Sequence, residues 1–78
     1  MIKVKNKGLI KALGSRIRDL RNEKGISQEA LANEAEVPLS QIGRIERGEN
    51  NPTISTLHVI AQALEVELKE LLDFKLKK

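Results

Sequence analysis

The apolar residues of this chain recur three or four positions apart over most of its length, which places them on one face of an α-helix. Strict alternation of apolar and polar residues, which would indicate β-strands, is almost absent. The pattern predicts a single all-α domain with a five-helix core at residues 9–74.

The first predicted helix runs from about Leu9 to Lys24 and stops at Gly25. Gly14 lowers the helix propensity near its start, so we expect the first turns to be frayed or separate. Residues 1–8 are predicted to form a flexible basic arm ahead of this helix. The residues predicted to face the core are Ile10, Leu13, Ile17 and Leu20.

Two short helices are predicted around a tight turn in the middle of the chain. Ser27 is a good N-cap for the first, at residues 28–35, and Pro38 suits the start of the second, at residues 39–47. A second helix that projects polar side chains is typical of the helix-turn-helix, which lays that helix in the DNA major groove. The predicted inward residues are Leu31, Ala32, Ala35, Ile42 and Ile45.

Two further helices complete the predicted core. Thr53 caps the fourth helix, whose inward face consists of Leu57, Ile60, Ala61 and Leu64. The fifth helix is predicted at residues 67–74, and a basic tail follows at residues 75–78. Leucines of this kind are more often core residues, but the fifth helix has many apolar residues for its length. Some are therefore expected to contact a second copy of the chain, the candidates being Leu68, Leu71, Leu72 and Phe74.

Several motifs occur in a fixed order along the chain: SQEALA (residues 27–32), IGRIERGE (42–49), NPTISTL (51–57) and IAQAL (60–64). With IRDLRNEKGIS (17–27) upstream, they make the chain resemble the Cro/repressor-like (Xre-type) helix-turn-helix family of bacterial and phage regulators. The resemblance covers roughly residues 13–72. It implies a five-helix lambda-repressor-like domain that binds double-stranded DNA.

The helix predicted at residues 39–47 carries the candidate base-reading residues. Arg44 is the strongest, because a guanidinium can bond O6 and N7 of a guanine at once, worth about 1–3 kcal/mol of discrimination. Ser40 can bond either type of base, and Leu39 can rest on a thymine methyl group. Gly43 is placed near the exposed face, where it would let the helix sit deep in the groove. The alternative for Arg44 is a solvated arginine paired with an acid.

Contacts to the DNA backbone are expected from other residues. Gln28 opens a helix, where unpaired amides and the positive end of the helix dipole favour a phosphate. The resemblance implies the same role, and the alternative is a simple helix-start residue. Further backbone contacts are predicted at Gln41, Arg47 and Asn51.

The resemblance also implies a structural ion pair between Arg21 and Glu46. If the pair is shielded from water, loss of one partner strands the other charge and destabilises the fold. Two positions depart from the family pattern. Glu36 stands where a glycine is frequent, so a left-handed backbone there would be strained, and Pro38 replaces a serine or threonine cap.

The net charge of +3 is unevenly distributed. Residues 1–24 hold eight bases and two acids, a balance of +6, whereas residues 25–72 hold three bases and eight acids, a balance of −5. A basic end can be a solubilising tail, or it can touch the DNA backbone and add salt-dependent affinity.

Composition excludes most other classes of function. The chain has no cysteine and one histidine, His58, so we expect no disulfide, no metal and no cofactor. There is no glycine-rich phosphate loop and no Ser/His/Asp set, so an enzyme is not expected. No apolar run approaches the ~20 residues that span a bilayer, and the amino terminus does not read as a secretory signal. A cytoplasmic protein is expected.

The sequence thus predicts a sequence-specific transcriptional regulator that binds a palindromic operator as a homodimer. Control by concentration and dimerisation is expected, with no small-molecule effector. Two alternatives stay open. The chain could be an antitoxin or other interaction module that binds a toxin or another protein and binds DNA only for autoregulation, or its helix-turn-helix could be a docking surface that no longer reads DNA.

Overall fold

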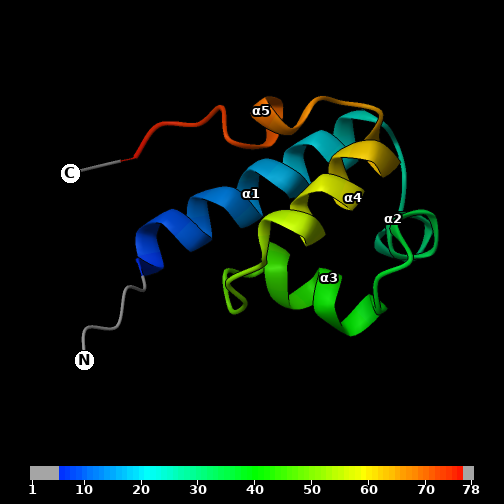
Figure 1. Cartoon of the computed structure of the whole chain (residues 1–78), viewed down its shortest axis with the longest axis horizontal. Helices are drawn as coiled ribbons and strands as arrows, with labels where there is room; N and C mark the ends of the chain where they lie inside the picture. The colour runs from blue at the N-terminus through cyan, green and yellow to red at the C-terminus, as the bar shows by residue number, and fades with distance from the viewer. Residues whose placement is uncertain (1–5, 77–78) are drawn as a thin grey trace.

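A computed structural model describes residues 6–76, which fold into five helices joined by short loops (Figure 1). No residue in this range lies in a β-strand. The predicted all-α fold is therefore confirmed. The helices are α1 (Lys7–Glu23), α2 (Gln28–Ala35), α3 (Leu39–Glu46), α4 (Ile54–Leu64) and α5 (Leu68–Leu71).

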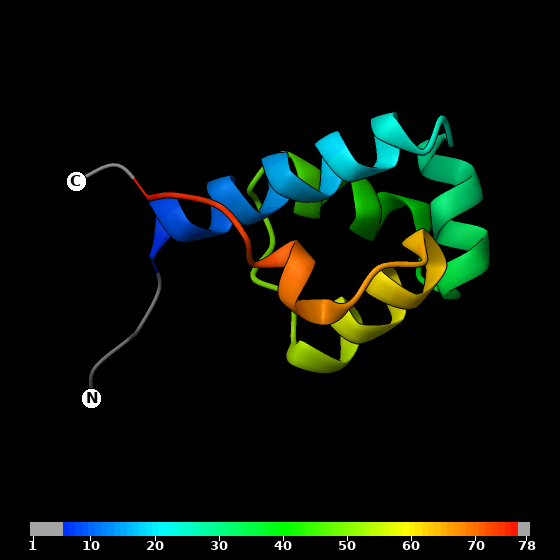
Figure 2. The same ribbon diagram turned by 90° about the horizontal axis from the view of Figure 1, so that it is seen from above.

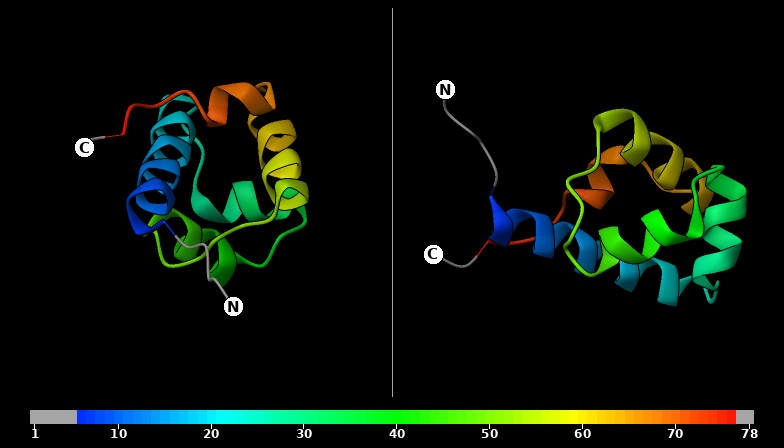
Figure 3. Two further views of the ribbon diagram at one scale, coloured as in Figure 1. Left: turned by 60° about the vertical axis from the view of Figure 1, so that its left-hand side comes forward. Right: turned by 90° about the horizontal axis from the view of Figure 1, so that it is seen from below.

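The helices enclose one apolar core. α1 and α4 lie on opposite sides of it, with α5 across one end and α2 and α3 across the other (Figure 3). Burial of a leucine or isoleucine side chain stabilises the folded state by about 1.5–3 kcal/mol. Every residue assigned to the inward faces of the first four helices is buried, with at most 7% of its surface exposed: Ile10, Leu13, Ile17, Leu20, Leu31, Ala32, Ala35, Ile42, Ile45, Leu57, Ile60, Ala61 and Leu64.

α1 begins two residues earlier than predicted. The side chain of Asn6 accepts a hydrogen bond from the amide of Leu9 at 3.0 Å, so Asn6 is the N-cap. Residues 6–8 therefore belong to the cap and first turn rather than to a flexible arm, and residues 1–5 lie outside the described part of the chain.

Gly14 does not break α1, contrary to the expectation of frayed first turns. The helix is continuous through it, and Gly14 is buried where α1 crosses the end of α3. A Cβ atom at Gly14 would lie 2.8 Å from the carbonyl oxygen of Glu46 and still closer to that of Ile45. The glycine is needed for this close crossing, which fixes α3 against α1.

α5 is much shorter than the predicted helix at residues 67–74. A capping box between Glu67 and Glu70 starts it, but it ends at Leu71. The carbonyl of Glu70, which would accept from Phe74 in a longer helix, accepts from Nε of Arg16 at 2.8 Å and from the amide of Asp73 at 3.4 Å. The following residues, to 76, run back beside α1 (Figure 2).

The turn between α2 and α3 has the strained geometry expected at Glu36. Its φ of 57° and ψ of 43° place it in the left-handed region, where its amide bonds the carbonyls at the end of α2. Val37 and Pro38 follow, and the carbonyl of Pro38 accepts from the amides of Gln41 and Ile42. α3 begins at Leu39, as predicted, without a side-chain cap.

Candidate nucleic-acid interface

The outward face of α3 carries the predicted base-reading residues. Ile42 and Ile45 are buried, each 1% exposed, so the opposite side of α3 faces solvent along the lower edge of the molecule (Figure 1). Leu39 is 45% exposed, and Ser40 and Arg44 are also exposed. All three residues are therefore exposed on α3.

Arg44 forms no ion pair with any residue in the described part of the chain. The alternative interpretation, a surface arginine held by an acid such as Glu34, has no such contact to support it. The Arg44 side chain is exposed on the outer side of α3, where its guanidinium can meet a base or a phosphate.

Gly43 is buried, which corrects its placement near the exposed face. The Arg47 side chain folds back over it: a Cβ atom at Gly43 would lie 3.0 Å from Nη1 of Arg47. The predicted backbone contact Arg47 is also paired with Glu49, through Nε to Oε2 at 3.0 Å and Nη2 to Oε1 at 3.2 Å. These hydrogen bonds lower the pKa of the Glu49 carboxyl and raise the pKa of Arg47.

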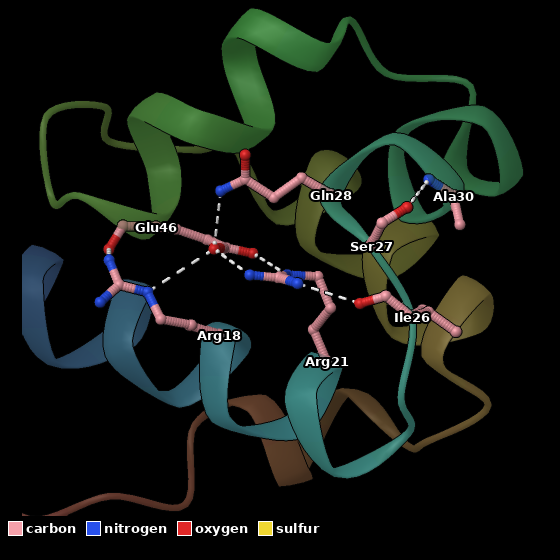
Figure 4. A network of polar contacts seen from close by, with 7 residues as sticks. All are labelled: Arg18, Arg21, Ile26, Ser27, Gln28, Ala30 and Glu46. Carbon is pink, nitrogen blue, oxygen red and sulfur yellow. Dashed lines mark hydrogen bonds and ion pairs between the residues drawn. The ribbon is translucent and has the colours of Figure 1, made fainter.

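Arg21 and Glu46 form the ion pair that the resemblance implied (Figure 4). Nε of Arg21 donates to Oε2 of Glu46 at 2.6 Å, and Nη2 donates to Oε1 at 3.0 Å. Nη1 of Arg21 donates to the carbonyl of Ile26 at 2.9 Å. The Glu46 side chain is fully buried, so the pair joins α1, the loop before α2 and the end of α3.

The burial of Glu46 raises the pKa of its carboxyl, but other contacts outweigh this effect. Hydrogen bonds from Arg21 and Gln28 and the nearby charges of Arg21 and Arg18 leave the pKa below its usual value. The carboxylate is therefore charged at neutral pH. The hydrogen bond to Glu46 in turn raises the pKa of Arg21.

Gln28 lies at the first position of α2 and takes part in this network. Its Nε2 donates to Oε1 of Glu46 at 2.9 Å, a contact that the sequence analysis missed (Figure 4). The Gln28 side chain is half-buried at the start of α2. A second contact that was missed is Arg18, whose Nη2 donates to the carbonyl of Glu46 at 3.1 Å. The spacing of Arg18 and Arg21, one helical turn apart on α1, was the available signal.

The remaining backbone candidates lie near the two ends of α3. Gln41 is half-buried in its first turn, and Asn51 is exposed in the loop that leads to α4. Thr53 caps α4 through a hydrogen bond of 3.1 Å from the amide of Thr56. The loop leads from the end of α3 to the start of α4, so Asn51 lies in the chain between these two helices (Figure 3).

The comparisons with known proteins agree with this geometry. A family model described as Helix-turn-helix matches residues 17–71. The chain belongs to the helix-turn-helix family. The uncharacterized HTH-type transcriptional regulator y4dJ of Sinorhizobium fredii is 41% identical over 61 residues, which cover 78% of this chain and 79% of that protein. Control protein C.SmaI of Serratia marcescens is 40% identical, with 77% and 71% covered.

The crystal structure of the restriction-modification controller protein C.AhdI from Aeromonas hydrophila is also similar to this helix-turn-helix protein. It has a TM-score of 0.77 and 41% sequence identity, covering 81% of this chain and 94% of that one. The protein is thus a transcriptional regulator with a helix-turn-helix DNA-binding domain, a class of protein that is not enzymatic. None of the helices within residues 6–76 has both the length and the apolar character to cross a membrane, and no three His, Cys, Asp or Glu residues there are grouped as metal ligands.

Proposed function

We propose that the protein regulates transcription by binding a palindromic operator as a homodimer, with α3 of each copy in a major groove. The observation that carries this proposal is the outward face of α3, where Leu39, Ser40 and Arg44 are exposed together above a buried Ile42 and Ile45. In this pose Arg44 reads a guanine, Ser40 bonds a base edge and Leu39 contacts a thymine methyl group. Because the target is DNA, we place the protein in the cytoplasm.

The backbone contacts we propose surround that face. Gln28 at the start of α2, Gln41 in the first turn of α3, Arg47 at its end and Asn51 in the next loop would grip phosphates and fix the register of α3. Gln28 can do so while its Nε2 bonds Glu46, because the amide group retains a second N–H donor.

The dimer contact we propose involves the end of α5. Leu72 is 47% exposed, and Leu68 and Phe74 are half-buried. Leu71 has no exposed surface because it belongs to the core of its own chain, so we omit it from the proposed contact. A two-fold dimer would place its recognition helices about 34 Å apart, one turn of DNA.

Selection of bound duplexes from a randomised DNA pool at physiological salt tests this function. Enrichment of an inverted repeat is expected, and Arg44→Ala is expected to lose the preference at one base pair in each half-site, by about 1–3 kcal/mol. Failure of the wild-type protein to enrich any sequence would overturn the operator proposal. If the purified protein instead bound a toxin or another protein, that result would support the alternative function, an antitoxin or other protein-interaction module.

A further inference from the structure

The ion pair between Arg47 and Glu49 lies on the surface proposed to meet DNA. Glu49 follows the end of α3 by three residues, and both side chains are 54% exposed. Arg47 donates through Nε and Nη2, the two parallel donors of its fork, to the two carboxylate oxygens. A phosphate group takes the same bidentate geometry from an arginine.

The other end of the guanidinium is also engaged. Nη1 lies over Gly43, only 3.0 Å from where a Cβ atom would be. Glu49 occupies the edge formed by Nε and Nη2, so a phosphate can take that edge of Arg47 only after Glu49 releases it. Arg44, the arginine within α3, is close enough for its charge to lower the pKa of Glu49 as well.

We propose that Glu49 is an internal phosphate mimic that holds Arg47 in the free protein and competes with the DNA backbone for its guanidinium. An exposed pair of this kind is weak, so DNA can displace the carboxylate. Glu49 thereby lowers the affinity for every DNA sequence to the same degree and leaves the base preference of α3 unchanged. This inference rests on the proposed contact between Arg47 and the DNA backbone.

The measurement is the Kd for a duplex that carries the selected inverted repeat and for a random-sequence duplex of equal length. Glu49→Gln is expected to tighten both by about two- to fivefold, the equivalent of releasing Arg47 from a weak exposed pair. Glu34→Gln is the matched control, because it removes the same charge from an exposed position of α2 that borders α4. We expect it to change neither Kd.

A double-mutant cycle separates competition from simple repulsion. In an Arg47→Gln background, Glu49→Gln is expected to have little effect. An equal gain in both backgrounds would show that Glu49 only repels DNA, and a weaker Kd for Glu49→Gln alone would show that it orients Arg47; either result overturns the proposal.

The pair can also be tested without DNA, by NMR titration of the Glu49 carboxyl. Its pKa is expected to rise toward the ordinary value in Arg47→Gln, and an unchanged value would overturn the pairing itself. If the titration shows the pair but the wild-type protein binds neither duplex, the proposed function fails, and the inference about DNA fails with it. If wild type binds and Glu49→Gln gives no gain, only the inference fails.

Discussion

Glu36 closes α2 in a backbone conformation that suits glycine. Its φ of 57° lies in the left-handed region, which for an L-residue costs roughly 1–2 kcal/mol. Glu65 ends α4 in the same way, with φ of 58°, and the sequence analysis gave no warning of it. The backbone amides of both residues still donate hydrogen bonds to carbonyls at the end of the preceding helix. The left-handed strain is therefore the cost of ending each helix at that residue.

Replacing Glu36 by glycine is therefore expected to stabilise the fold. The gain should be about 0.5–1 kcal/mol, since the relief of the left-handed strain exceeds the extra chain entropy of glycine. Urea denaturation at neutral pH measures it. Ala30→Gly, at an exposed position within α2, is the control and should lose about 1 kcal/mol. A clear fall in stability for Glu36→Gly would contradict the left-handed geometry.

Glu46 makes the stability of the fold depend on acid pH. Its pKa is lowered in the folded chain, so its contribution is present above its ordinary pKa of 4.5 and is lost as the pH falls through the lower folded value. Glu46→Gln strands Arg21 and is expected to cost about 3 kcal/mol at pH 7. The difference between the two proteins should shrink in urea titrations below pH 4.5. A constant difference from neutral to acid pH would be evidence against this ion pair.

The crossing of α1 over α3 depends on Gly14. Gly14→Ala is expected to destabilise the fold by about 1–3 kcal/mol although alanine is the better helix former, because its Cβ would meet backbone carbonyls that cannot move aside. Gly8→Ala is the matched control in the same helix. Its Cβ would meet only Asn6 Oδ1 at 3.5 Å, an ordinary contact, so that variant should not lose stability. Equal stability of Gly14→Ala and wild type would refute the close crossing.

The helices whose apolar faces repeat over several turns were predictable from the sequence. α2 matches its predicted bounds, and α3 differs only at its final residue. The spacing of apolar residues is enough to predict these helices, because an apolar stripe along one side of a helix must face the core. The pairing of Arg21 with Glu46 was predicted from the family resemblance, because the spacing of apolar residues says nothing about ion pairs.

The errors lie where a tertiary contact decides the outcome. The low helix propensity of glycine predicted a weak point in α1 at Gly14. The structure shows instead that Gly14 lets α1 pack closely against the end of α3, which is distant in the sequence. At the end of α5, Arg16 of α1 donates a hydrogen bond to the Glu70 carbonyl, a contact between residues far apart in the sequence. Gly43 is a local exception: it was placed by helical angle alone, and it is covered by the side chain of Arg47, four residues later. Whether the outward residues of α3 read bases remains a prediction.

The molecule as a whole places its proposed DNA-binding and dimer surfaces on different elements. α3 presents the first, and the end of α5 presents the second on the opposite side of the core (Figure 1). Binding to a palindrome would couple them, because two recognition helices must be held at one fixed distance.

Leu72→Ala tests that coupling. It is expected to weaken self-association about tenfold in sedimentation velocity and to weaken operator binding at low protein concentration, because Leu72 supplies the exposed apolar surface of the contact. Lys69→Ala, at an 80% exposed side chain of the same helix, should change neither. Far-UV circular dichroism should be unchanged in both. Unaltered association of Leu72→Ala would place the dimer contact elsewhere.

In α3 the residues that pack in the core are different from those proposed to contact bases. This difference affects how the operator preference of such a regulator can change. One side of the helix is fixed by Ile42, Ile45 and the buried carboxylate of Glu46, and the other side carries Leu39, Ser40 and Arg44 without core contacts. A library randomised at those three outward positions should therefore keep its members folded while their preferred operators diverge. In the proposed binding mode, single substitutions at these positions would give new specificities and leave the scaffold intact.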